Sequence, residues 1–138
     1  MATIYHEFVV DAPAQFVWEV IKDVGAVHSR LAQGCVTATD LGDRERTVTF
    51  SNGFVVREKI IGVNDDVHRL SYCAVGGRAS HHNAYFQVFS ASEERSRVLW
   101  VTDFLPDEVR APIEQMVEHG AEAMKQTLER SYLATKSH

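Results

Sequence analysis

The chain has 138 residues, a formal net charge of −5 and hydrophobic residues at 45% of its positions. This length suits one domain with a single core, which we expect to span residues 1–138. No apolar run approaches the roughly 18 residues of a membrane span and no basic cluster is present, so we expect neither a membrane span nor a nucleic-acid partner. The N-terminus carries Glu7 and Asp11 and lacks the pattern of a signal peptide, which predicts a cytoplasmic location.

The first predicted element is a strand over residues 3–10, "TIYHEFVV", because apolar side chains recur at every second position. A helix is predicted next. Asp11 suits its N-cap, Pro13 suits its first turn, and apolar residues then follow at helical spacing. A short second helix or turn is expected around "GAVHSRLAQG", residues 25–34.

Six further strands are predicted in close succession. The segments between them, "LGD", "SNG", "NDD", "GGRAS" and "ASEER", consist of residues that favour turns. Short turns between consecutive strands indicate antiparallel hairpins. The strands are expected near residues 35–41, 45–51, 54–63, 68–75, 82–90 and 96–105.

After Pro106 the pattern changes to that of a long helix with one apolar stripe. The predicted fold class is therefore α+β: a curved, seven-stranded antiparallel sheet around a long C-terminal helix, with two short helices after the first strand. The stripe consists of Ile113, Met116, Val117, Gly120, Ala121, Met124 and Leu128.

Three segments in this order resemble the START-related helix-grip superfamily. They are "VDAPAQFVWEVIKDV", the run "GDRERTVTFSNGFVVREKIIGVNDDVHRLSYCAVGG", and the strand of Trp100 that leads through Phe104 and Pro106 into the long helix. The superfamily includes the birch-pollen-allergen family, the plant abscisic acid receptors and bacterial polyketide cyclase-like proteins. The resemblance implies a hydrophobic cavity between the sheet and the long helix.

A small hydrophobic or amphipathic ligand is expected in that cavity. Pleat parity places Glu58 on the more apolar face of its strand, while the resemblance adds Tyr72 and Ala74. The candidate ligand contacts are Phe54, Val56, Glu58, Tyr72, Ala74, His81, His82, Ala84, Phe86, Ile113, Val117, Gly120, Ala121 and Met124.

Glu58 is the polar candidate on which the site depends, because a buried carboxylate needs a partner or a proton. Two interpretations stay open: a group that contacts the ligand through water, as the abscisic acid receptors imply, or a structural ion pair with an arginine such as Arg46. Glu58, His82 and Asp103 are weak candidates for proton transfer. The resemblance turns Asp103 inward, whereas an aspartate just before a helix is more often a cap or a solvated residue.

His81 and His82 are adjacent in the predicted strand, so their side chains point to opposite faces and cannot bind one metal ion together. HExxH and CxxC spacings are absent, and Cys35 and Cys73 are expected to be small buried thiols. We therefore expect no metal and no cofactor. Pleat parity turns His82 inward, whereas the resemblance to the receptors' latch loop favours His81.

Departures from the abscisic acid receptors argue against a hormone receptor. The turn at residues 51–53 is short where the receptors have a long loop, and Gln33 and Ala84 stand where they have a lysine and a tyrosine. These features bring the chain closer to the polyketide cyclase-like proteins. Gly120, in the middle of the helix, indicates either close helix–sheet packing or room for a ligand.

Three functions follow as hypotheses. The first is a protein that binds a small hydrophobic or amphipathic molecule, and the second is a cyclase- or dehydratase-like enzyme that uses Glu58 or a histidine for proton transfer. The third is an interaction module whose outer sheet face, with Trp100 and Phe104, contacts a partner or a second copy in a homodimer.

Overall fold

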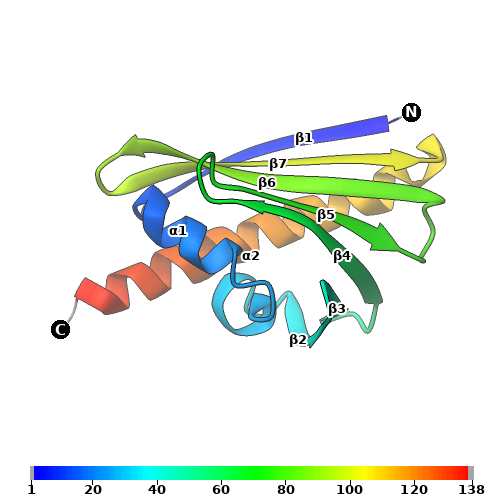
Figure 1. The fold of residues 1–138 in the computed structure, drawn as a ribbon, viewed down its shortest axis with the longest axis horizontal. Helices are drawn as coiled ribbons and strands as arrows, with labels where there is room; N and C mark the ends of the chain where they lie inside the picture. Colours follow the sequence, from blue (N-terminus) through cyan, green and yellow to red (C-terminus); the bar gives the residue numbers. More distant parts are fainter. Residues whose placement is uncertain (1, 137–138) are drawn as a thin grey trace.

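A computed structural model describes residues 2–136, in which a seven-stranded sheet curves around a long helix (Figure 1). The strand order is β1-β7-β6-β5-β4-β3-β2, and every neighbouring pair is antiparallel. This confirms the predicted α+β helix-grip fold, and the predicted strand ends differ from the observed ones by at most two residues. The elements are β1 (Ala2–Val10), α1 (Ala14–Ile21), η1 (Val27–Leu31), β2 (Val36–Gly42), β3 (Glu45–Phe50), β4 (Val55–Asn64), β5 (Arg69–Val75), β6 (His81–Ser92), β7 (Arg95–Leu105), η2 (Asp107–Val109) and α2 (Arg110–Lys136).

The start of α1 differs from the prediction. Pro13, in an extended conformation, is the N-cap residue, and no side chain caps the helix. Asp11 lies too early in the chain to cap it: its carboxylate pairs with Arg95 at 3.0 Å, and its backbone N–H donates to Glu129. The predicted second helix is η1, a single turn of π-helix.

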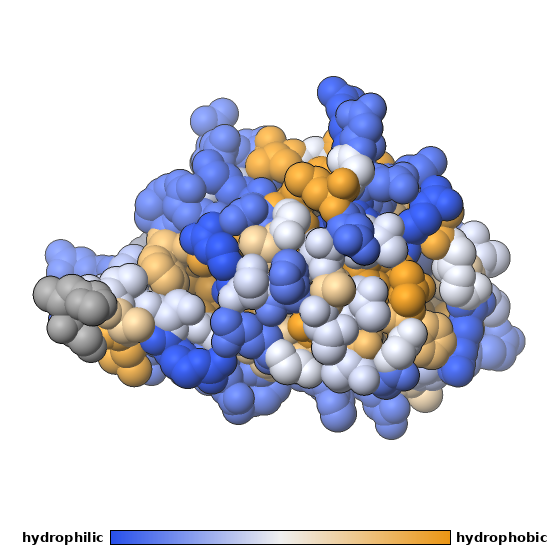
Figure 2. Space-filling model, turned by 90° about the horizontal axis from the view of Figure 1, so that it is seen from below, coloured by the Kyte–Doolittle hydropathy of each residue, from blue (hydrophilic) through white to orange (hydrophobic). Residues whose placement is uncertain are grey.

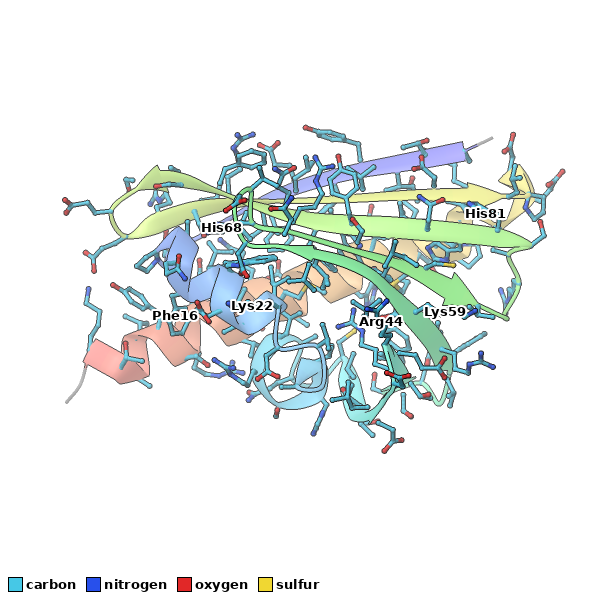
Figure 3. All side chains as sticks on the ribbon, in the orientation of Figure 1. Phe16, Lys22, Arg44, Lys59, His68 and His81 are labelled. Atoms are coloured by element: carbon cyan, nitrogen blue, oxygen red, sulfur yellow. The ribbon has the colours of Figure 1, made fainter. Side chains whose placement is uncertain are left out.

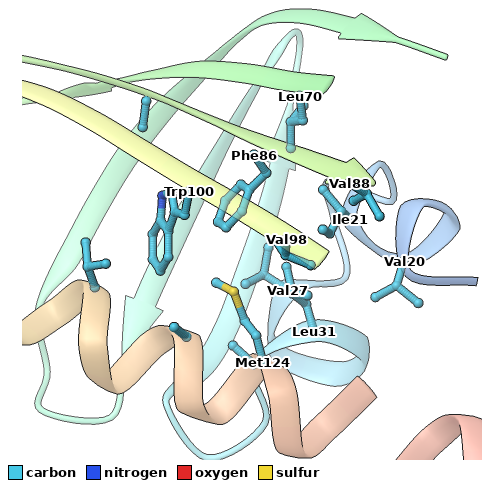
Figure 4. Packing of buried hydrophobic residues seen from close by; sticks show 14 of the residues in the cluster. Val20, Ile21, Val27, Leu31, Leu70, Phe86, Val88, Val98, Trp100 and Met124 are labelled. Atoms are coloured by element: carbon cyan, nitrogen blue, oxygen red, sulfur yellow. The ribbon is translucent and has the colours of Figure 1, made fainter. Parts of the chain in front are cut away.

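The concave face of the sheet packs against α2, and the strand register shows which residues lie on it. Opposite residues of antiparallel strands share a face, so Tyr72, Ala84 and Thr102 form one row across β5, β6 and β7. Trp100 pairs with Phe86 in the next row toward α1. Figure 4 shows both side chains between the strands and α2.

Trp100 and Phe104 were predicted on the outer face, and this prediction is wrong. They are 4% and 0% exposed and lie on the concave side. Parity could not decide between the faces because the alternate residues of β7 are apolar too. One of these, Val101, is buried on the outer face between Tyr5 and Tyr85 of the neighbouring strands.

Helix α2 runs along the free edge of β1. Lys125 Nζ donates to the carbonyl of Val9 at 2.7 Å, and Arg110 donates to the carbonyl of Thr3 at 3.3 Å. These bonds satisfy edge carbonyls that would otherwise be available for pairing with another strand. Within residues 2–136, no helix is both long enough and apolar enough to cross a membrane.

Candidate functional site

One end of the concave face combines polar and small side chains, and we call it the open half. It lies between Trp100 and the end of the sheet formed by the β3–β4 turn and the β5–β6 loop. Arg46 pairs with Glu58, and Glu58 pairs with Ala74. Cys73 pairs with Asn83 in the antiparallel register of β5 and β6. Continued by one residue, this register places His82 opposite Ala74. Glu58 and His82 therefore flank Ala74 on one side of the sheet.

Glu58 forms an ion pair with Arg46, the structural alternative that the sequence left open. Arg46 Nε donates to Glu58 Oε1 at 2.7 Å, and the two residues are 3% and 9% exposed. Arg46 also reaches the carbonyl of Val24 at 3.4 Å. Among the described residues, none donates a hydrogen bond to Glu58 Oε2. The pair balances the buried charge and leaves one carboxylate oxygen available as an acceptor.

The Arg46 guanidinium lies over the ring of Tyr72, 5.3 Å from its centroid. Tyr72 Oη accepts a hydrogen bond from Trp100 Nε1 at 3.1 Å. Burial, followed by the charge of Glu58, raises the pKa of Tyr72, so its hydroxyl stays protonated and can itself donate.

The two histidines lie on opposite faces, as the pleat requires. His82 is half-buried on the concave side with its ring edge-on to Phe104, at 6.4 Å between centroids. Burial, and to a lesser extent the charge of His81, lowers the pKa of His82, which is therefore neutral near pH 7. His81 is exposed on the outer face near the start of β6 (Figure 3), bonded to Asn83 at 2.6 Å. Its predicted place in the cavity is wrong, because the register of β6 shows no slip at this position.

Two other predicted site residues also lie elsewhere. Asp103 is on the outer face, where Thr3 Oγ1 and Asn83 Nδ2 donate to its carboxylate, so the inward orientation implied by the receptors is wrong. Phe54 precedes β4 and is 46% exposed. Its ring lies under the guanidinium of Arg78 at 5.6 Å, on the rim of the open half.

Gly120 allows close packing of helix and sheet, the first of its two predicted interpretations. A Cβ at this position would lie 3.2 Å from two ring atoms of Trp100. Phe86 stacks on Trp100 at 4.6 Å between centroids, and Met124 is buried beyond it (Figure 4). These two predicted contacts therefore belong to the packed core. The remaining predicted contacts, Val56, Ala84, Ile113, Val117 and Ala121, are buried or half-buried.

Two surface depressions lie away from the open half. One surrounds the β4–β5 turn and includes Asp65 and Arg69, and the other lies between the β6–β7 hairpin and the end of α2 and includes Glu94 and Tyr132. Neither is lined by a predicted ligand contact. Figure 2 shows apolar side chains in several separate places among polar ones on the face seen from below. Over residues 2–136, no three His, Cys, Asp or Glu side chains are grouped to hold a metal ion.

Comparisons with solved structures show the same fold. The protein XoxI from Bacillus cereus has a TM-score of 0.84 at 18% identity, with 100% of both chains covered. Norcoclaurine synthase from Thalictrum flavum, in complex with dopamine and hydroxybenzaldehyde, has a TM-score of 0.75 at 20% identity, covering 96% of this chain and 87% of that one. A START superfamily protein from Mycobacterium smegmatis has a TM-score of 0.77 at 12% identity, covering 93% and 97%. A search of the curated proteins finds no match.

A family model extends this likeness from the fold to the sequence. The model described as polyketide cyclase / dehydrase and lipid transport matches residues 1–134. The match covers nearly the whole chain, including both short helices, the seven strands and most of α2. The chain therefore belongs to the polyketide cyclase / dehydrase and lipid transport family.

Proposed function

We propose that the chain binds a small hydrophobic or amphipathic molecule between the concave sheet face and the first half of α2. The observation that carries this proposal is the row on which Glu58 and His82 flank Ala74. Two inter-strand spacings separate their backbones by about 10 Å. The small side chain of Ala74 lies between them, and that of Ala84 lies on the next row. A ligand placed above these alanines would reach both polar groups.

The groups around this space match the composition of small-molecule sites, which are mostly apolar with a few orienting polar groups. Glu58 Oε2 would accept a hydrogen bond from a ligand hydroxyl or amine, and the Tyr72 hydroxyl would donate one. Neutral His82 would do either, depending on its tautomer. Val117 on the helix and Phe104 on the sheet are the buried apolar residues of this half. Membership of a family described by lipid transport as well as by cyclases supports the same proposal.

A cyclase- or dehydratase-like enzyme is the second candidate, and the lowered pKa of His82 favours it. A neutral histidine can accept a proton near pH 7, and Glu58 lies across Ala74 on the same row. A substrate held above Ala74 would have a base on one side and an ion-paired carboxylate on the other. In this candidate His82 takes the proton and Glu58 orients the substrate.

Glu58→Gln tests the binding proposal, with the neighbouring outer-face change Lys59→Gln as its matched control. We expect a ligand from cell extract or an aromatic library to raise the Tm of the wild type and of the control. The shift should fall strongly in Glu58→Gln when each protein is compared with its own ligand-free Tm. Equal shifts in all three proteins would contradict the placement of the ligand. A His82→Gln variant that still binds but no longer turns a substrate over would support the enzyme.

Three broader expectations belong to the same proposal. Residues 1–138 form one domain, which predicts a single cooperative unfolding transition. The protein is cytoplasmic, which cell fractionation would check. A homodimer remains a prediction for sedimentation analysis, but Trp100 and Phe104 cannot form its interface because they are buried in the monomer.

A further inference from the structure

We infer that a wall of side chains crosses the interior and limits the proposed pocket to a compact ligand, such as a one- or two-ring molecule or a short chain, to the exclusion of long-chain lipids. The wall consists of Gly120, Trp100, Tyr72, Arg46 and Glu58, and we call it the Trp100 wall. The inference rests on the proposed function, because it specifies which ligands fit that same site.

The wall begins at α2. The side chain of Trp100 extends from β7 to the helix (Figure 4), where Gly120 has no side chain to block it. A Cβ at Gly120 would come within 3.2 Å of Trp100 Cη2 and Cζ3, tighter than ordinary van der Waals contact. The indole therefore lies close against the helix at Gly120.

From Trp100 the wall continues across the sheet. Trp100 Nε1 donates to Tyr72 Oη at 3.1 Å, and this bond fixes the indole in its plane. The guanidinium of Arg46 lies over the Tyr72 ring, 5.3 Å from its centroid, and Arg46 Nε donates to Glu58 Oε1 at 2.7 Å. Hydrogen bonds and the ion pair give the wall a defined geometry, which apolar contacts alone would define less sharply.

The space behind the wall is filled. Phe86 stacks on the indole at 4.6 Å, and Val98 and Leu128 are 0% exposed. A long ligand would have to displace such side chains, and displacing side chains in a close-packed interior lowers the stability of the fold. From Trp100 to Phe104, at the end of the sheet, β7 extends about 13 Å. The proposed pocket can therefore hold a ligand of about this length along β7.

The wall also presents polar groups to the pocket. Glu58 Oε2 and the Tyr72 hydroxyl proton have no partner among residues 2–136, so a ligand that reaches the wall satisfies them best with a hydroxyl, carbonyl or amine. A long-chain lipid that enters with its hydrocarbon tail first has no polar group at the end that reaches the wall. Size and polarity at the wall thus exclude the same class of molecule.

The test is a series of straight-chain alcohols from butanol to dodecanol, with 2-naphthol as a two-ring probe, measured by isothermal titration calorimetry on the whole chain. Each buried methylene should raise the affinity about fourfold. For the wild type we expect this increase to stop within the series, and we expect 2-naphthol to bind. An affinity that keeps rising through dodecanol would contradict the inference that the Trp100 wall limits the length of the ligand.

Trp100→Phe removes the ring atoms that reach Gly120 and the donor to Tyr72, so the increase should extend to longer alcohols. Trp18→Phe, a change at the other tryptophan, which is buried in α1, is the matched control and should leave the plateau unchanged. The same plateau in both variants would overturn the role of Trp100. If Trp100→Phe does not fold, the wild-type series alone decides. Failure of every alcohol and of 2-naphthol to bind would instead refute the proposed function itself.

Discussion

The two halves of the interior, on either side of Trp100, are built differently. The sealed half, between Trp100 and α1, is mostly apolar: Val98, Leu128 and Val17 are fully buried there. The open half contains an ion pair, a half-buried histidine and two alanines on its sheet face. The sheet and α2 pass through both halves, whereas α1 packs against β6 and β7 in the sealed half.

This difference separates stability from binding. Apolar burial in the sealed half supplies stabilisation that scales with buried area. The open half also buries apolar side chains, Phe104 and Val117 among them, but its buried polar groups reduce the net gain. Binding sites are commonly drawn from the less stable parts of a fold. We therefore expect apolar burial to stabilise the sealed half without an opposing polar cost, while the proposed ligand contacts lie in the open half.

The largest expected effect is in the open half. Arg46→Met leaves the Glu58 carboxylate buried without its counter-charge, and we expect a loss of about 3–5 kcal/mol in the free energy of unfolding. The double variant Arg46→Met/Glu58→Leu removes both charges and should recover most of that loss. Urea denaturation measures all three proteins. A double variant no more stable than the single one would show that the pair stabilises the fold by itself.

The next effect compares apolar residues of the two halves on the same helix. Leu128→Ala removes a fully buried side chain from the sealed half and should cost about 3 kcal/mol. Ile113→Ala removes a half-buried one from the open half and should cost about 1 kcal/mol, because less area returns to water. Urea denaturation of both variants is the measurement. Equal losses would remove the distinction between the halves.

A smaller effect is expected at the boundary between them. Gly120→Ala gains about 1 kcal/mol of helix propensity, but its Cβ presses on Trp100 at 3.2 Å, and overpacking costs about 1–3 kcal/mol. We expect a net loss of about 1 kcal/mol in the wild-type background. In the Trp100→Phe background the contacted atoms are gone, so the same change should become stabilising. Thermal unfolding of the four proteins gives the sign, and the same sign in both backgrounds would contradict the contact.

The sequence predicted the strands closely because each is bounded by turn residues and followed by another alternating run. Parity also placed Glu58 and His82 correctly on the concave side, since the opposite faces of their strands are more polar. It failed for Trp100 because both faces of β7 are apolar and only the neighbouring strands decide between them. A glycine in mid-helix, matched to a large aromatic residue elsewhere, was the signal that could have placed Trp100 inside.

The site was predicted less completely than the fold. Arg46 was named as a partner for Glu58, but its contact with Tyr72 depends on the curvature of three strands, which no local pattern encodes. Asp103 and His81 were assigned inward by likeness to the receptors. The register of β6 and β7 places both on the outer face instead, where Asp103 bonds to Thr3 and His81 to Asn83. A resemblance between distantly related sequences predicts the fold but not the orientation of single side chains.

The smallest expected effect is the pH dependence that His82 gives to stability. Its pKa is lowered in the folded protein, chiefly by burial, so the unfolded chain binds the proton at a higher pH than the folded one. Stability should therefore fall as the pH drops through the ordinary histidine value near 6.5, and the fall should end below the lowered folded pKa. His82→Gln should flatten this part of the stability curve, whereas His119→Gln, at an exposed position on α2, should leave it unchanged. Urea denaturation between about pH 5 and 8 measures both variants. A wild-type slope that survives in His82→Gln would place the titrating group outside the open half.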